Sequence, residues 1–436
     1  MFRRLNRAIF AVLIVFSSAG SAAAIDIQEV TSDLGITAWL VSDDTVPVVA
    51  VDVAFEGAGS TQDPEGKAGR ANIMAALLDE GAGDLDSVAF QTALQDNAVR
   101  LSFEATRDHL YGDMRALSSS VEEGFGLMRL ALTEPRFDEH VIERIRAQVI
   151  TGLRRDLNDP DAAVAKLWSR TAFPDHPYGI PANGTLETVA NLTRDDMVAA
   201  HKAALGQDSL FIAVVGDIDA ETLKTLLDKT FGDLPQTADI TPVPPVEPTA
   251  GLTVTETLAT PQTAIRFGGP GLKREDPDFI PAFVMNHILG GGSFSSWLFE
   301  EVREKRGLAY SVYSYMAPFE HSAIFGAGTA TRNDQADQAI EVILSQFQKM
   351  ASEGPTEEEL NDAKAFLTGS FALRFGSSSS IARQLLFLQL EELGMDYIDK
   401  RNSLIEAVTL EDVRRAASRI FDGPEPTVAI VGAAEG

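Results

Sequence analysis

The 436-residue sequence contains no cysteine. Disulfides, thiolate zinc sites, thiol nucleophiles and cysteine-attached haem are therefore excluded. Histidine is scarce too: there are six, and no two are four residues apart, the spacing that places two imidazoles of a catalytic zinc site on one helix face. After residue 24 no run of 18 apolar residues occurs, so that part of the chain predicts no membrane span.

Basic residues are also in short supply. Lys and Arg number 36 against 64 Asp and Glu, which gives a formal net charge of −28. Nucleic acid is not an expected partner, because phosphate contacts need a basic surface. An acidic field favours cationic ligands or a less acidic partner, and it favours solubility equally well.

The N-terminus has the order of a secretory signal peptide. Arg3, Arg4 and Arg7 precede the apolar run AIFAVLIVF, and small residues follow up to Ala24. We expect cleavage before Ile25, which would remove three positive charges and take the net charge from −28 to −31. The chain is then exported, periplasmic and free of the membrane. A retained membrane anchor is the alternative.

A proline-rich stretch divides the rest of the chain into two similar lengths. LPQTADITPVPPVEPTAG contains five prolines and has no helical or strand periodicity, as expected of a semi-stiff linker. The predicted organisation has four parts: a signal peptide at 1–24, an N-terminal domain at 25–235, a linker at 236–251 and a C-terminal domain at 252–436.

The two halves resemble each other in sequence. A helix pattern from Thr193 leads to a strand ending at Gly216, and a second helix pattern from Thr409 leads to a strand ending at Gly432. In each motif the glycine follows the threonine by 23 positions, and the two motifs are offset by 216, which indicates a duplicated unit.

Strand patterns cluster before long helical patterns in each half. In the first half, ITAWLV is expected to pair with VVAVDVAF, and VRLSFEA with HLYGDMRAL. Strand clusters followed by helix clusters are typical of an α+β fold rather than a parallel βαβ fold. The predicted fold class is therefore α+β, with two homologous domains, each a largely antiparallel sheet packed with helices.

Two further stretches carry polar side chains in loop contexts. DLNDPD at 156–161 lacks the glycine and distal glutamate of a calcium loop, so a helix-ending turn is the better interpretation. FPDHPYGIPANG at 173–184 predicts an ordered loop, in which His176 is expected to be a structural hydrogen-bonding residue rather than a metal ligand.

A glycine-rich turn opens the segment LGGGSFSSWLFEEVREKRGLAYSVYSY. Ser295 or Ser296 is expected to cap a helix that Gly307 ends, and a strand follows. Arg303 in the last turn and Tyr310 in the strand are predicted to meet around one point, where both can donate hydrogen bonds to a carbonyl oxygen or an oxyanion. The other interpretation is a dipole-compensating arginine and a half-buried strand tyrosine.

The sequence resembles the insulinase/pitrilysin family of zinc metallopeptidases, whose members carry an inverted H-x-x-E-H motif. The resemblance rests on GSTQDPEGKAG at 59–69, the HPYG-containing loop, the proline-rich linker and REKRGLAYSV, and it extends over nearly all of residues 30–434. It implies a pair of related α+β domains, in agreement with the repeat.

The same resemblance implies that the zinc site is lost. In the family, H-x-x-E-H follows directly after the lead-in, where this chain has NIMAA. Asn72 and Ala76 thus replace the two histidine ligands, and Ala75 replaces the general-base glutamate. Gly152 replaces the third ligand, also a glutamate. These residues cannot hold zinc or activate its water, so no cofactor is expected in this chain.

The resemblance gives Arg303 and Tyr310 a role, because family members place such a pair, seven residues apart, across a closed chamber from the zinc. The pair is expected to bind the substrate backbone and the oxyanion. The turn before them is expected to line the chamber and bind substrate: Gly290, Gly291, Gly292 and Ser293.

The expected function is a non-catalytic, substrate-binding subunit of a heteromeric zinc metalloendopeptidase that degrades peptides in the periplasm. Alone it would be inactive. Its partner would be a homologous H-x-x-E-H subunit carrying the zinc, in a heterodimer, and its ligands would be unfolded peptides that add to a sheet edge. The alternative is a catalytically inert structural or peptide-binding scaffold. A stand-alone hydrolase with a relocated site is a third, weaker hypothesis.

Overall fold

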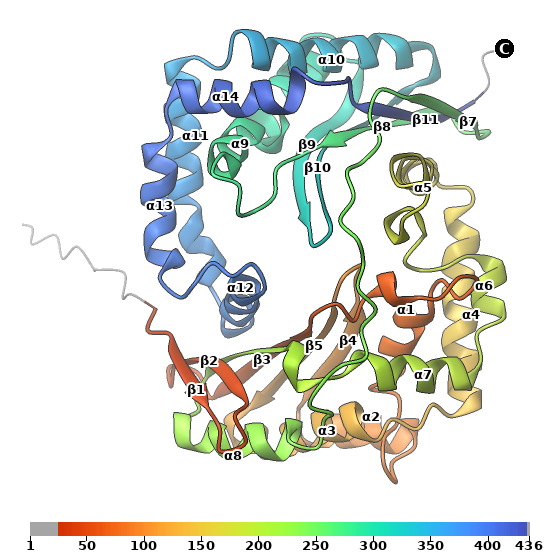
Figure 1. The fold of residues 1–436 in the computed structure, drawn as a ribbon, viewed down its shortest axis with the longest axis vertical. Helices are drawn as coiled ribbons and strands as arrows, with labels where there is room; N and C mark the ends of the chain where they lie inside the picture. Colours follow the sequence, from red (N-terminus) through yellow and green to blue (C-terminus); the bar gives the residue numbers. More distant parts are fainter. Residues whose placement is uncertain (1–24, 434–436) are drawn as a thin grey trace, which may run out of the picture.

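Each half of the chain contains one β-sheet, and helices surround both sheets (Figure 1). The computed structural model describes residues 25–433, so the predicted signal peptide at 1–24 lies outside the described residues. The first sheet has six strands: β1 (Gln28–Thr31), β2 (Thr37–Ser42), β3 (Val48–Phe55), β4 (Arg100–Ala105), β5 (Leu110–Leu117) and β6 (Leu210–Gly216). The second sheet has five: β7 (Thr253–Thr257), β8 (Gln262–Pro270), β9 (Ala309–Phe319), β10 (Ser322–Arg332) and β11 (Thr427–Gly432).

The α-helices follow the strand clusters, as the sequence predicts. The first half contributes α1 (Arg70–Ala75), α2 (Ser87–Asp96), α3 (Val121–Thr133), α4 (Glu139–Asp156), α5 (Pro160–Ala172), α6 (Leu186–Ala190), α7 (Arg194–Ala204) and α8 (Ala220–Phe231). The second contributes α9 (Phe279–Asn286), α10 (Ala336–Ser352), α11 (Glu357–Gly369), α12 (Ser378–Leu390), α13 (Tyr397–Ala407) and α14 (Leu410–Phe421). Within residues 25–433, none of the helices is both long and apolar enough to cross a bilayer.

Five strands of each sheet share one topology, and β1 is an additional edge strand of the first sheet. Strand order is β1-β2-β6-β3-β5-β4 in the first and β7-β11-β8-β10-β9 in the second. β6 runs parallel to β2 and antiparallel to β3, while β11 runs parallel to β7 and antiparallel to β8. The α+β fold with a duplicated unit is therefore confirmed. The domain boundaries at 235 and 252 stay a prediction.

The repeated helix–strand motif has the same capping chemistry in both copies. The Thr193 side chain caps α7 by accepting from the Asp196 amide, and the Asp196 carboxylate accepts from the Thr193 amide in return. Thr409 and Asp412 form the same capping box at α14. Each box satisfies amides at the helix start that have no partner within the helix, so the conserved spacing reflects a shared local structure.

One predicted strand pairing is wrong. ITAWLV and VVAVDVAF, which form β2 and β3, are not neighbours, because β6 lies between them. β6 is apolar and mostly buried, so it belongs inside the sheet. The short connection between β2 and β3 suggested a hairpin, and nothing local indicated a strand inserted from 150 residues later. The second predicted pair, β4 with β5, is confirmed.

The halves exchange one helix each. α5 comes from the first half but packs on β8 and β11 of the second sheet, while α12 comes from the second half and packs on β3 and β6 of the first. The exchange is also visible in Figure 1. The Trp168 indole N–H on α5 donates to the Thr427 carbonyl at 3.2 Å, and the Gln389 amide on α12 donates to the Ile212 carbonyl at 3.0 Å. Each half therefore depends on the other to cover its sheet.

Side chains of the loop predicted from HPYG form a second set of contacts between the halves. Tyr178 is fully buried, and its hydroxyl donates to the Asp108 carboxylate at 2.8 Å and accepts from the His321 amide at 2.9 Å. His176 accepts from the Tyr178 amide through Nδ1, and its Nε2 lies 3.0 Å from the Pro244 carbonyl in the linker. Both ring nitrogens are occupied, as expected of a structural histidine.

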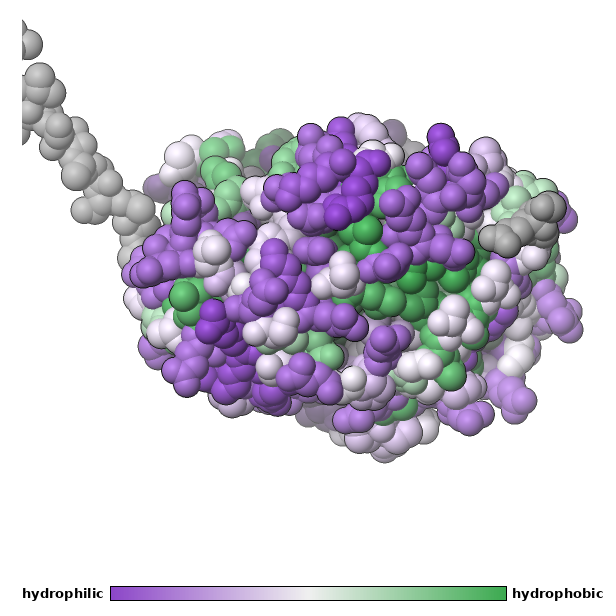
Figure 2. All heavy atoms as spheres, turned by 90° about the horizontal axis from the view of Figure 1, so that it is seen from above, coloured by the Kyte–Doolittle hydropathy of each residue, from purple (hydrophilic) through white to green (hydrophobic). Residues whose placement is uncertain are grey.

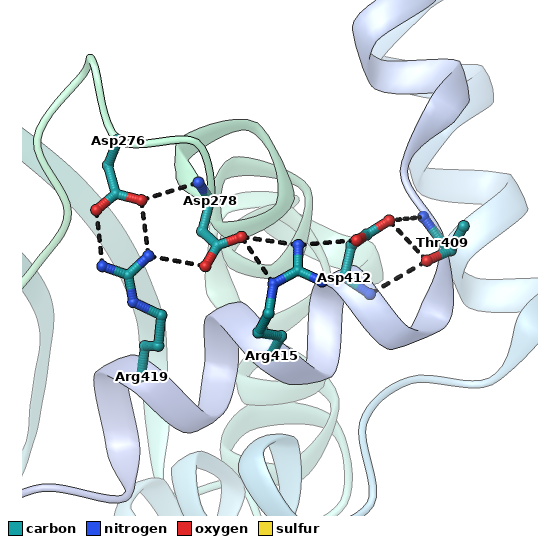
Figure 3. Close-up of polar contacts among 6 residues, drawn as sticks. All are labelled: Asp276, Asp278, Thr409, Asp412, Arg415 and Arg419. Atoms are coloured by element: carbon teal, nitrogen blue, oxygen red, sulfur yellow. Dashed lines mark hydrogen bonds and ion pairs between the residues drawn. The ribbon is translucent and has the colours of Figure 1, made fainter.

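The face of the second half seen in Figure 2 is mostly hydrophilic, and one of its hydrophobic patches lies in a hollow between hydrophilic side chains. A shallow groove on this half is lined by side chains of α10, α14 and the end of β8. On α14, Arg415 and Arg419 bind two carboxylates in the turn before α9, those of Asp276 and Asp278, at 2.7–2.9 Å (Figure 3). These ion pairs fix α14 against α9.

Candidate functional site

The lead-in to α1 is a structural device. Asp63 accepts hydrogen bonds from three successive amides at the start of the helix, those of Gly69, Arg70 and Ala71, at 2.8–3.1 Å. Gly69 has φ +93°, and a Cβ there would lie 2.9 Å from the Asn183 carbonyl oxygen. The segment is thus retained for helix capping and loop packing, which need no catalytic side chains.

The residues at the degenerate zinc positions offer nothing that binds metal. Asn72 and Ala75 lie on α1, Ala76 caps its end and Gly152 lies on α4, which packs against α1. A Cβ added at Gly152 would meet no atom within 4 Å, so space for a side chain remains there. Within residues 25–433, no group of three or more His, Asp or Glu side chains is placed to hold a metal ion. The side chains at these four positions are an amide, two methyl groups and a hydrogen atom, and they do not provide the ligands of a zinc site.

Arg303 lies on a π-helical segment, Phe299–Glu304. The predicted helix therefore differs from the observed one: it begins near Trp297 and widens, with the Lys305 amide donating to the Glu300 carbonyl, five residues back. A second π-helical segment, His287–Gly291, precedes the glycine-rich turn. π-helical segments are rare in proteins, and those that occur often lie at functional sites.

Tyr310 lies in a β-bulge. Pairing of β9 with β10 shifts register between Val312↔Thr329 and Ala309↔Thr331, so Tyr310 and Ser311 together oppose one residue. The bulge interrupts the alternation of the strand and leaves two consecutive residues exposed. Without it, the alternation set by Val312 would bury Tyr310, which is instead 80% exposed.

Arg303 and Tyr310 meet, as the sequence predicts. The guanidinium lies over the Tyr310 ring, 4.6 Å from its centroid. Two rings that sequence reasoning missed hold it from other sides: Phe299 at 4.7 Å and Phe294 at 5.9 Å. The Arg303 side chain is 30% exposed and Nε lies 3.7 Å from a Glu304 oxygen. Stacking orients the guanidinium while its N–H groups still reach solvent.

The four residues of the predicted glycine-rich turn differ in how closely they are packed. Gly290 is buried, and a Cβ there would lie 2.5 Å from the Ser314 Oγ on β9, so its glycine is required by packing. Gly291 is similarly close to the Asn286 side chain, and Gly292 to the His287 carbonyl. Ser293 is exposed and has φ +52°.

A cavity of about 1560 Å³ lies between the halves. Its lining comes from β3, β4, β5, α12, the turn at 273–275 and the β9–β10 hairpin. Neither Arg303 nor Tyr310 lines it, and neither does the glycine-rich turn. The candidate pair is therefore separate from this cavity.

Comparison with known proteins shows which family the chain resembles. The model of the peptidase M16 inactive domain matches residues 191–367. A non-peptidase homolog, YmxG, of Helicobacter pylori is 27% identical over 77% of this chain and 77% of its own length. A peptidase M16 inactive domain of Pseudomonas fluorescens has a solved structure with TM-score 0.88 and 25% identity, covering 94% of this chain and 98% of that one.

The chain is similar to the M16 peptidase family.

The family match bears on the two parts of the site differently. The matched region contains Arg303 and Tyr310 but not α1. Some relatives are named non-peptidase homologs and others zinc proteases. An uncharacterized zinc protease of Streptomyces coelicolor is 26% identical over 86% of this chain and 83% of its own length. The matched M16 domain is the inactive one, and Asn72 and Ala75 stand at the positions where the resemblance implies zinc-site residues.

Sequence reasoning also missed Asp52, which lines the cavity from the middle of β3. The sequence does contain a signal for Asp52. All eight residues of VVAVDVAF are buried, and a single carboxylate interrupts an otherwise apolar run. Charged residues are almost never fully buried without a partner, so an isolated one in a central strand points to a specific role.

Proposed function

We propose that this chain is the substrate-binding, non-catalytic subunit of a heteromeric zinc metalloendopeptidase that degrades peptides. Its partner would be a homologous subunit with an intact H-x-x-E-H motif, in a heterodimer. In that complex the partner's zinc supplies Lewis-acid chemistry. This chain supplies Arg303 and Tyr310, which bind the peptide backbone and donate hydrogen bonds to the oxyanion.

The observation that carries the proposal is the backbone irregularity under both residues. A π-helical segment presents Arg303 and a β-bulge presents Tyr310, and the two meet at 4.6 Å on an accessible surface. Regular backbone would be more stable at both places, so the irregularities favour a role in binding over a purely structural one. An exposed position also suits a site that a second subunit completes.

The test is a cleavage assay with a fluorogenic unfolded peptide and zinc. The homologous H-x-x-E-H protein of the same organism is assayed alone, this chain alone, and the two mixed. We expect cleavage by the mixture and none by this chain alone. Arg303→Ala should reduce the rate of the mixture about 100-fold, because one preorganised donor to the oxyanion is lost. Tyr310→Phe should reduce it by a similar factor.

Arg306→Ala is the matched control, because Arg306 is a neighbouring arginine that pairs with Glu301 and does not contact Tyr310. Its rate in the mixture should stay within about twofold of the unaltered chain. If the H-x-x-E-H protein cleaves equally well alone, the chain is instead the inert structural or peptide-binding scaffold.

We also propose that residues 1–24 direct export to the periplasm and are then removed. Support comes from the order of basic, apolar and small residues in that segment. Mass spectrometry of the chain purified from the periplasmic fraction should give an N-terminus at Ile25. An intact N-terminus in the membrane fraction would show a retained anchor.

A further inference from the structure

Asp52 is a buried carboxylate without a full set of partners. It is 8% exposed, and its Oδ2 has no hydrogen-bond partner within residues 25–433. On the same strand face, Ala50 and Ala54 pack against α12. An unpartnered buried charge destabilises the fold, so its presence in a central strand calls for a compensating role.

The surroundings of Asp52 are strongly acidic and open to the cavity. Asp113, directly opposite on β5, accepts a 2.6 Å hydrogen bond from the Ser102 hydroxyl. The cavity lining holds nine carboxylates and four Lys or Arg side chains. Burial raises the pKa of Glu56 and of Glu391, and the nearby Glu320 carboxylate raises both further. The wall therefore favours a cationic occupant.

An organic cation suits this wall better than a metal ion does. Within the described residues, no cluster of three or more ligating side chains exists, so a divalent cation would lack ligands here. The cavity of about 1560 Å³ also exceeds the range usual for small-molecule sites, about 300–1,000 Å³. A peptide with a basic side chain fits both facts.

We propose that Asp52, with Asp113 beside it, binds an Arg or Lys side chain of a peptide held in the cavity between the halves. This site lies away from Arg303 and Tyr310 and requires no second subunit. It rests on the proposed function only in taking a peptide as the ligand. A bound guanidinium would give the free Asp52 oxygen a charge-assisted hydrogen bond.

The experiment measures binding by the chain alone, without any partner. The probe is a fluorescein-labelled nonapeptide of Gly, Ser and Ala with one central Arg, and its control carries citrulline, which has the same shape without the charge. Fluorescence anisotropy in the presence of EDTA should give a Kd about tenfold lower for the Arg peptide. Asp52→Asn should bring the two Kd values within about twofold of each other.

Asp79→Asn is the matched control, because burial raises the pKa of Asp79 to about 6 but the residue does not line the cavity. It should keep the preference for Arg. Equal Kd values for the Arg and citrulline peptides, or a preference that survives Asp52→Asn, would overturn the proposal. Far-UV circular dichroism confirms that each variant is folded. Because no partner is present, this result is independent of the cleavage assay.

Discussion

Asp52 sets a pH dependence on stability that is opposite to that of most carboxylates. Burial, reinforced by Asp113, raises the pKa of Asp52 to about 7, while Arg383 on α12 opposes the shift. β6 places uncharged Ala213 on the other side. The folded chain keeps a proton that the unfolded chain releases near pH 4, so stability falls as the pH rises from about 4 to about 7.

We therefore expect Asp52→Asn to stabilise the chain at alkaline pH. At pH 8 the free energy of unfolding should rise by about 1–3 kcal/mol, because an unpartnered buried charge is removed. At pH 4, where Asp52 is protonated in the fold, the change should be below about 0.5 kcal/mol. Urea unfolding at both pH values measures this. A variant that is less stable than the unaltered chain at pH 8 would refute it.

The helices and strands divide into those that local sequence predicts and those that packing decides. The α7 and α14 caps follow from Thr–Asp spacing alone. The turn at DLNDPD ends α4 as expected, and it also begins α5. These features depend on contacts within one turn of helix.

The irregular elements of the candidate site could not be predicted. The sequence indicates Arg303 and Tyr310, and the family resemblance gives them a role. The π-helical segment under Arg303, with its hydrogen bond from the Lys305 amide to the Glu300 carbonyl, has no sequence signal. The bulge at Tyr310 depends on how β9 pairs with β10, whose register shifts between Thr329 and Thr331. Sequence patterns describe regular periods, and both irregularities depart from them.

The ion pairs that hold α14 should weaken in acid. Arg415 and Arg419 lower the pKa of Asp278, which is 6% exposed, and Arg419 lowers that of Asp276. Lowered pKa values mean that this stabilisation is complete above about pH 4 and is lost as the pH falls further. Both arginines are almost half exposed, which limits their contribution.

The double variant Arg415→Ala/Arg419→Ala should lose about 1–2 kcal/mol of stability at pH 7. The loss should shrink between pH 4 and pH 2, where the carboxylates become protonated in both proteins. Arg414→Ala, an exposed change on the same helix, is the control and should cost less than about 0.5 kcal/mol. A loss that is independent of pH would argue against the ion pairs.

The two halves should unfold together, because each covers the sheet of the other. Far-UV circular dichroism and tryptophan fluorescence should give coincident urea transitions. Tyr178→Phe should lower the free energy of unfolding by about 2–3 kcal/mol, since it leaves buried Asp108 and the His321 amide without their shared partner. Two separate transitions in the unaltered chain would show that the exchanged helices do not couple the halves.

The exchange of α5 and α12 also orders the events of biosynthesis. When the ribosome has made the six strands of the first sheet, it has still to add more than 150 residues before α12 exists. Until then the face formed by Ala50, Ala54, Ala213 and Val215 has no cover. Exposed apolar strands at that stage favour aggregation or capture by chaperones. The native state of the first half is thus reached only after nearly the whole chain has been translated.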